Sequence, residues 1–202
     1  ESAWKLGVKY VGVVFFNPSP RSLTIEDARP LLENAPKDLV KVGLVVNPDD
    51  ELVRLVSDLN LDMLQLHGLE TISRVQEIRK VSGLDIIKAL GVREKADLKK
   101  VYQYAKVADQ ILIDAKPESD VDLPGGNGTQ FNWDLIKDKS WTFPWFLAGG
   151  INEANLLEAL KKTNAKQVDL SSGVEDKHGR KDIDRIVRFV KKVKEYEECH
   201  SV

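Results

Sequence analysis

The chain has 202 residues, a length that α/β barrels routinely fill as one unit, so we expect a single domain over residues 1–202. Hydrophobic residues make up 42% and charged residues 31% of the chain, with 30 basic against 32 acidic residues. This composition excludes a disordered or collagen-like chain, and it offers no broad basic surface for nucleic acid. Any phosphate that the protein binds should therefore belong to a small molecule.

The sequence also predicts the cellular compartment of the protein. Cys199 is the single cysteine, which excludes an internal disulfide and fits a reducing environment. No apolar run approaches the length of about 18 residues that a membrane helix needs. Residues 1–7 have neither the charged start nor the apolar stretch of a signal peptide. We expect a cytoplasmic protein that does not contact membranes.

Seven short apolar runs, rich in β-branched residues, recur along the chain, and each is followed by a segment with helical periodicity. The predicted strands are residues 10–16, 40–46, 63–67, 85–90, 110–114, 145–148 and 167–171. Because most of these runs are apolar almost throughout, they indicate a parallel sheet that is covered on both faces.

Helices are predicted to begin between these strands. A hydroxyl or carboxylate cap precedes acidic residues at Thr24 and at Asp49, which is typical of a helix start. Apolar residues then follow at the spacing of one helix face. The remaining helices are expected to start near Glu70, Glu94, Asn152 and Lys181.

Regular alternation of strands and helices leaves an open doubly wound sheet or a closed (βα)8 barrel of TIM type. Almost every predicted strand ends in a polar residue or in glycine, a distribution that favours a barrel with its site on the carboxyl rim. Seven strands are one too few. We therefore expect the first strand and part of the first helix to lie before Glu1, with residues 1–7 as the end of that helix.

Two consecutive late turns suggest a phosphate site. Gly149 and Gly150 follow the sixth predicted strand, and Ser171, Ser172 and Gly173 follow the seventh. Main-chain amides in such turns bind anions, and the last two βα loops of barrels commonly hold a phosphate. The alternative is a pair of ordinary turns that use glycine for its freedom at positive φ.

Two aspartates are candidates for proton chemistry. Asp114 ends an apolar run, so its carboxyl group should lie at the rim of the core, where partial burial raises the pKa and suits a proton donor. Asp169 lies beside the second of the late turns. Either residue could instead cap a neighbouring amide at the end of its strand.

Three other side chains belong to the predicted rim. Gln65 and His67 are two residues apart on one strand and therefore point to the same side. Arg21 follows a proline-rich segment that could hold its guanidinium towards a carboxylate. A hydrogen-bonded structural histidine and a surface arginine are the alternatives. With three histidines and one cysteine, and no ligand spacing among them, we expect no metal site.

A third glycine-rich segment contains Gly125, Gly126 and Gly128. It lies in a long polar loop after Asp114 and is not a phosphate loop of the Walker type, because no Gly-Lys-Ser/Thr follows. The loop is either a lid over the mouth of the site or a merely flexible connection.

Taken together, the motifs resemble the phosphoribosylanthranilate isomerases of tryptophan biosynthesis. The matching segments occur in the family's order over nearly the entire chain: 12–21, 65–68, 87–89, 112–114, 125–128 with 131–133, 147–150 and 168–175. The resemblance implies a (βα)8 barrel that performs an Amadori rearrangement of a phosphorylated small molecule without a cofactor.

The resemblance also implies roles. Asp114 matches the family's general acid, and Arg21 matches an arginine that is associated with the anthranilate carboxylate. The turns at Gly149–Gly150 and Ser171–Gly173 match its phosphate loops. Gln65 and His67 would line the same mouth, and Asp169 would contact sugar hydroxyls or support the site.

One departure from the family pattern concerns the base. Family members begin with a strand whose cysteine removes the C2′ proton, and the sequence from Glu1 contains no such segment. Cys199 is a poor substitute, because barrel helices run back from the catalytic rim. We therefore expect the 202-residue chain alone to be inactive or nearly so, and fusion to or association with another tryptophan-pathway domain would account for its start.

Two other functions fit part of the pattern. One is a non-catalytic barrel that binds a sugar phosphate and has lost its base. The other is a different barrel enzyme acting on a phosphorylated sugar, such as an epimerase, which would share the phosphate turns but not the set of Arg21, His67 and Asp114.

Overall fold

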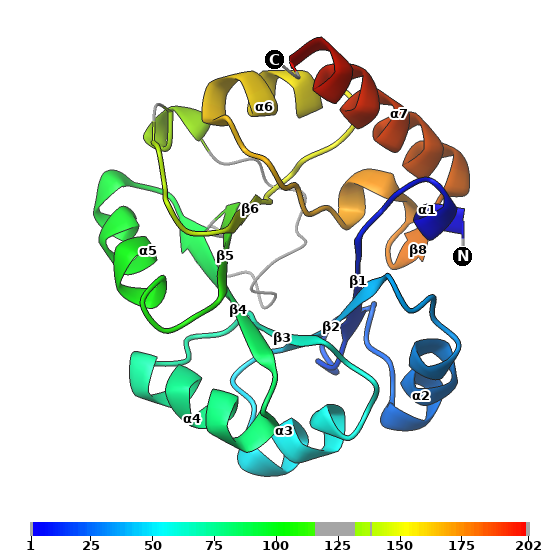
Figure 1. The fold of residues 1–202 in the computed structure, drawn as a ribbon, viewed down its shortest axis with the longest axis vertical. Coiled ribbons are helices and arrows are strands. Elements are labelled where there is room, and N and C mark those ends of the chain that lie inside the picture. The colour runs from blue at the N-terminus through cyan, green and yellow to red at the C-terminus, as the bar shows by residue number, and fades with distance from the viewer. Residues whose placement is uncertain (1, 116–131, 138, 201–202) are drawn as a thin grey trace.

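The computed structural model describes residues 2–115, 132–137 and 139–200. Its main feature is a curled six-stranded sheet in which each strand pairs in parallel with the next along the chain. Figure 1 shows the helices arranged around the outside of this sheet. The strands are β1 Tyr10–Val14, β2 Val40–Val45, β3 Met63–Leu66, β4 Asp85–Val92, β5 Gln110–Ala115 and β6 Trp145–Leu147.

Helices alternate with these strands, as predicted. They are α1 Ser2–Lys5, α2 Ile25–Glu33, α3 Asp50–Ser57, α4 Ile72–Ser82, α5 Leu98–Tyr104, α6 Leu156–Thr163 and α7 Ile183–His200. Side-chain caps fix several starts: Thr24 accepts a hydrogen bond from the Asp27 amide, and Asp49 accepts one from the Leu52 amide. Each cap satisfies an amide that the first helical turn leaves without a partner.

Side chains of the sheet alternate between its inner and its outer face. Val42, Met63, Ile87, Leu112 and Phe146 form one buried cluster inside the curled sheet. Two larger clusters lie between the sheet and the helices. Because successive residues of a strand point to opposite faces, every second residue after Met63 or Leu112 points inward. This alternation decides which polar residues can meet at the carboxyl ends of the strands.

The seventh predicted strand is present only in part. Residues 167–169 exchange two backbone hydrogen bonds with Leu147, and Val168 forms an isolated bridge to it. The chain then turns into a short 3₁₀ helix, η3 Ser172–Val174, followed by a hairpin of β7 Glu175–Lys177 and β8 Arg180–Lys181. The segment is therefore placed beside β6 as expected, but the early turn leaves it too short to form a regular strand.

The prediction for the start of α6 is wrong. This helix begins at Leu156 rather than near Asn152. Two asparagine side chains accept hydrogen bonds from main-chain amides in the preceding turn. The Ala154 amide donates to Asn152 Oδ1, and the Asn152 amide donates to Asn155 Oδ1. Such local side-chain bonds stabilise a turn in place of helix. The helix predicted from Glu94 likewise opens as a 3₁₀ turn, η1 Lys95–Asp97.

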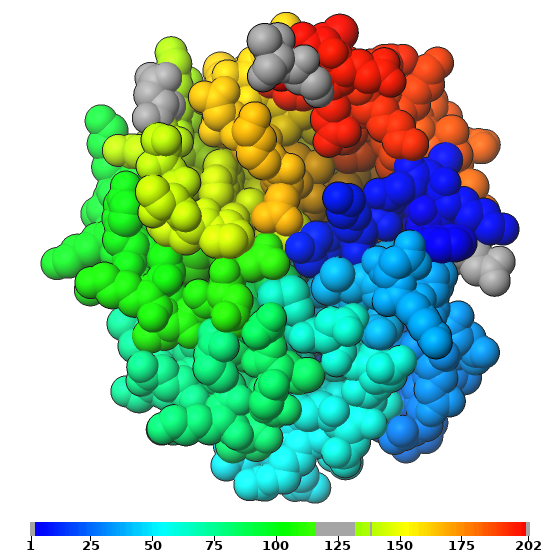
Figure 2. All heavy atoms as spheres, viewed as in Figure 1, coloured from blue at the N-terminus to red at the C-terminus, as the bar shows by residue number. Residues whose placement is uncertain are grey.

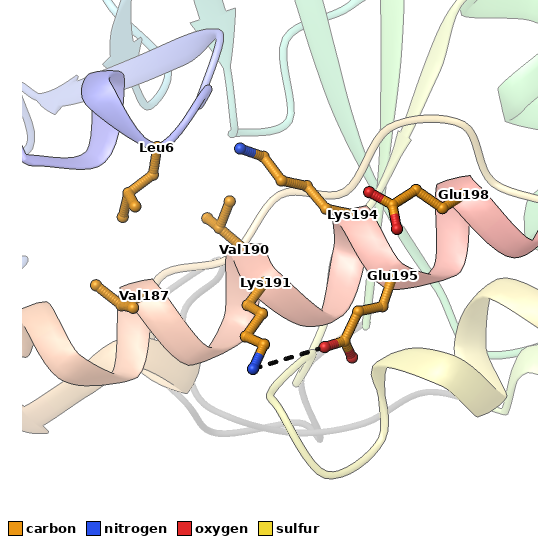
Figure 3. Close-up of a pocket in the computed structure, with 7 residues that line it drawn as sticks. All are labelled: Leu6, Val187, Val190, Lys191, Lys194, Glu195 and Glu198. Atoms are coloured by element: carbon orange, nitrogen blue, oxygen red, sulfur yellow. Dashed lines mark ion pairs between the residues drawn. The ribbon is translucent and has the colours of Figure 1, made fainter.

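Two surface features complete the description. Figure 2 shows that, in the view of Figure 1, side chains close over the centre of the curled sheet. Figure 3 shows a groove between the α1 turn and α7, where Leu6 faces Val187 and Val190 and the Lys191–Glu195 ion pair lies on its rim. None of the predicted site residues lines this groove. In the described ranges, no helix has the length and apolar character to cross a membrane.

Candidate active site

A histidine and an aspartate from strands on either side of β4 meet at the carboxyl ends of the sheet. His67 follows β3 and Asp114 lies in β5, and both have the inward parity set by Met63 and Leu112. His67 Nε2 is 3.3 Å from Asp114 Oδ2. Both side chains are largely buried, with 12% of the His67 and 9% of the Asp114 side chain exposed. The predicted convergence of these two residues is therefore present in the structure.

Gln65 sets the orientation of the histidine ring. Its Nε2 lies 3.0 Å from His67 Nδ1, and an amide nitrogen can only donate. With that assignment Nδ1 accepts, so the histidine proton is on Nε2, the ring nitrogen that lies nearer to Asp114. The other carboxylate oxygen, Asp114 Oδ1, accepts the Ala115 amide at 2.7 Å. One oxygen of Asp114 is thus held by a main-chain amide, and the other lies 3.3 Å from the histidine ring.

Asp169 joins this group from the segment beside β6. Removal from water and then the negative charge of Asp114 raise the pKa of the Asp169 carboxyl, while His67 and Lys181 act in the opposite direction. Asp169 is nevertheless an exposed residue, so these effects act on a carboxyl group that solvent still reaches. A carboxyl group that holds its proton more tightly than usual, next to a second carboxyl group that lies beside a histidine, is an arrangement typical of proton-transfer sites.

The glycine turn after β6 lies directly against the aspartate. Gly149 and Gly150 have φ values of 82° and 67°. A Cβ on Gly149 would stand 2.6 Å from the Ala115 nitrogen and 3.0 Å from Asp114 Oδ1. Only glycine combines that backbone conformation with so close an approach. The carbonyl of Gly150 accepts bonds from the side chains of Asn152 and Asn155, which hold the turn in place.

The second turn packs on the first. A Cβ on Gly173 would lie 2.1 Å from the Ile151 carbonyl oxygen, so the η3 turn and the Gly150–Ile151 turn are in contact. Ser171 is fixed by Lys181, whose Nζ donates to its carbonyl oxygen at 2.9 Å and to its Oγ at 2.8 Å. The two late turns therefore form one continuous rim next to Asp114.

Arg21 has a partner within the chain. Its Nε and Nη2 donate to the two carboxylate oxygens of Glu175 at 2.7 and 2.8 Å. Burial alone would raise the pKa of Glu175, but hydrogen bonds from Arg21, Lys181 and the Gly179 amide outweigh it and hold that pKa far below its usual range. A bidentate pair of this kind fixes the guanidinium plane.

Glu175 and Lys181 are functional candidates that sequence reasoning did not single out. Glu175 lies at the end of a segment that matches the family, but nothing in its local sequence distinguishes it from a surface carboxylate. Its burial to 4% side-chain exposure and its distance of 154 residues from Arg21 along the chain are tertiary facts. The predicted lid glycines Gly125, Gly126 and Gly128 lie outside the described residues.

A parallel βα sheet that collects a histidine, two aspartates and paired glycine turns at its carboxyl ends has the architecture of barrel enzymes. A family model for N-(5'phosphoribosyl)anthranilate (PRA) isomerase matches residues 1–192. An N-(5'-phosphoribosyl)anthranilate isomerase of Ruegeria sp. (strain TM1040) is 48% identical over 192 residues, covering 94% of this chain and 89% of that protein. The enzyme of the same name from Paramagnetospirillum magneticum is also 48% identical, covering 92% and 86%.

Solved structures agree with this assignment. The phosphoribosyl anthranilate isomerase of Thermotoga maritima superposes with a TM-score of 0.84 at 33% identity, covering 96% of this chain and 92% of that one. A phosphoribosyl anthranilate isomerase in complex with reduced 1-(o-carboxyphenylamino)-1-deoxyribulose 5-phosphate gives 0.80 at 31% identity, covering 96% and 91%. This chain belongs to the N-(5'-phosphoribosyl)anthranilate isomerase family, and the predicted barrel class is confirmed.

Proposed function

We propose that this protein catalyses the cofactor-independent Amadori rearrangement of N-(5-phosphoribosyl)anthranilate to 1-(2-carboxyphenylamino)-1-deoxyribulose 5-phosphate, with Asp114 as general acid. The observation that carries the proposal is the position of the Asp114 carboxyl group, 3.3 Å from His67 on one side and against the Gly149 turn on the other. A sugar whose phosphate is bound by the two turns would present its ring oxygen to that carboxyl group.

The first half of the reaction needs one proton. Protonated Asp114 gives its proton to the furanose ring oxygen, the bond between C1′ and that oxygen breaks, and the nitrogen lone pair forms the C1′–N double bond of an iminium ion. The carboxylate that is left can then attract the Nε2–H of His67, 3.3 Å away, into a hydrogen bond. This bond and the Ala115 amide stabilise the negative charge that develops on Asp114.

The second half removes a proton from C2′ and gives an enolamine, which becomes the amino ketone. In the family to which the chain belongs, a cysteine of the first strand is the expected base, and Cys199 on the last helix is an exposed residue. The expectation that the 202 residues alone turn over little or no substrate rests on this point. The comparisons do not support it, because the relatives are named as isomerases, so it stays a prediction.

The other contacts follow from charge and position. The amides of Gly149, Gly150, Ser172 and Gly173 would bind the phosphate, since paired turns of this kind form anion sites in barrels. Glu175 uses Nε and Nη2 of Arg21, which leaves Nη1 for the anthranilate carboxylate. Asp169 and Gln65 would contact the sugar hydroxyls.

The test separates chemistry from binding. In the full-length protein, Asp114→Asn should abolish turnover of N-(5-phosphoribosyl)anthranilate while a reduced product analogue still binds with an affinity within about threefold of wild type, since the amide is isosteric. Steady-state kinetics and calorimetric titration measure the two quantities. Equal loss of affinity and rate would mean that Asp114 is a binding residue, and unchanged turnover would refute the proposed mechanism.

A further inference from the structure

A buried lysine–glutamate pair lies directly behind the proposed site and does not face it. Lys88 and Glu70 each have 1% of the side chain exposed, and Lys88 Nζ is 2.9 Å from Glu70 Oε2. Ile87 and Ala89 point into the curled sheet, so Lys88 between them points outward, towards the helices. The pair therefore cannot contact a substrate at the inner mouth.

The ammonium group of Lys88 holds the backbone on both sides of His67. It donates to the Leu66 carbonyl at 3.0 Å and to the Gly68 carbonyl at 2.9 Å, as well as to Glu70. The Leu66 carbonyl belongs to the peptide group before His67 and the Gly68 carbonyl to the peptide group after Gly68, so a single cation holds the backbone on both sides of the histidine. A buried charge with this many partners is much harder to move than an ordinary turn.

Glu70 holds the other side of the same turn. Its carboxylate accepts the Gly68 amide at 3.0 and 3.1 Å and, through Oε1, the Asn47 amide at 2.8 Å. Asn47 in turn accepts the Leu69 amide at 2.7 Å. The turn after β3 is therefore tied to the turn after β2 and, through Lys88, to β4.

A helix residue closes the network. The Tyr104 hydroxyl of α5 donates to the Glu70 carbonyl at 2.8 Å, and its ring lies 5.8 Å from Lys88 Nζ. Burial lowers the pKa of Lys88, although the charge of Glu70 opposes that effect. A buried ion pair seldom stabilises a fold more than apolar residues of the same volume would, so its presence here calls for another role.

We propose that Lys88 and Glu70 are positioning residues that hold the His67 turn so that Nε2 stays beside the Asp114 carboxyl group, 3.3 Å from Oδ2. The inference rests on the proposed function for its kinetic consequence but not for its geometric one. Without the hydrogen bonds from Lys88 and Glu70, the turn that carries His67 should shift. Displacements near 1 Å at a reacting group lower rates by as much as about a hundredfold.

The main variant is Lys88→Met with Glu70→Gln in the full-length protein, which removes both charges without leaving one buried alone. We expect kcat to fall between tenfold and a hundredfold, while KM changes less than about threefold. Glu70→Gln alone, which keeps the shape of the side chain, should lower kcat in the same direction and serves if the double variant does not fold.

A spectroscopic readout makes the test independent of turnover. The ¹⁵N chemical shifts of His67 should report a fixed Nε2–H tautomer in the wild-type protein and averaged tautomers in the variants. His200, which stacks on Tyr196 at the end of α7, should not change in any of them. If the wild-type protein shows no turnover, the proposed reaction fails, while the histidine spectra still decide whether the pair positions His67.

Arg79→Met is the matched control. Arg79 also joins a helix to the sheet, donating to Asp109 Oδ2 at 2.6 Å and to the Val107 carbonyl at 3.1 Å, but at the amino end of β5. It should lower stability without changing kcat or the His67 spectrum. Folded Lys88 or Glu70 variants with wild-type kcat and an unchanged His67 tautomer would overturn the proposal, as would an equal change in Arg79→Met.

Discussion

Gly149→Ala offers the sharpest test of the contact between the late turn and Asp114. The backbone at Gly149 has φ of 82°, and a side chain in that region costs about 1–2 kcal/mol. The new Cβ would also lie 2.6 Å from the Ala115 nitrogen, and such overpacking typically costs about 1–3 kcal/mol more. We expect the free energy of unfolding to fall by about 2–5 kcal/mol, out of a total of roughly 5–15 kcal/mol.

Gly83→Ala is the matched control. Gly83 ends α4 with φ of 69°, but a Cβ there would meet nothing within 4 Å. It should lose only the conformational part, about 1–2 kcal/mol. Urea denaturation measures both values, with unchanged slopes showing that the denatured states are alike. The difference between the variants isolates the close approach.

The functional consequence is a second measurement on the same pair. Because the alanine methyl group would press on Ala115 and Asp114, Gly149→Ala should weaken binding of a reduced product analogue by at least tenfold, and Gly83→Ala should leave it unchanged. Equal unfolding free energies and equal affinities in the two variants would refute the reasoning, since they would show that the turn does not approach Asp114 as the structure places it.

Two further predictions concern the pH dependence of stability. The pKa of Glu175 is lowered in the folded state. Its contribution to stability is therefore present above the unfolded pKa of about 4.3 and is lost as the pH falls below that value. The unfolding free energy of Glu175→Gln should depend less on pH in acid than the unfolding free energy of wild type does. The pKa of Asp169 is raised in the folded state, so wild type should lose stability as the pH rises above about 4. Thermal melts should show that Asp169→Asn is the more stable protein at neutral pH. A less stable variant would contradict the raised pKa.

The alternation of strands and helices could be predicted from the sequence because it is local. Apolar runs such as residues 63–67 and caps such as Thr24 act over a few residues, and the structure has β3 Met63–Leu66 and a Thr24 cap at those places. The late start of α6 escaped prediction because the side chains of Asn152 and Asn155 compete with the helix for the same main-chain amides. That competition depends on exact geometry rather than on periodicity.

Much of the candidate site could also be predicted, because parallel strands bring their carboxyl ends to one edge. Asp114, His67 and Gly149 are each recognisable as residues at strand ends, and they lie together in the structure. The lid glycines remain a prediction. Glu175 could not be identified as a site residue from the sequence, since it pairs with Arg21 and Lys181 only in the folded protein.

The sequence alone determined the class of fold and the side on which chemistry would occur, because burial patterns and strand parity are properties of neighbouring residues. The tertiary structure decided the electrostatics. Three features join residues that are far apart along the chain: the buried pair of Lys88 and Glu70, the bidentate contact of Arg21 with Glu175, and the closeness of Asp169 to Asp114. Charges interact through space, and their strength depends on the water that folding removes, which no local pattern records.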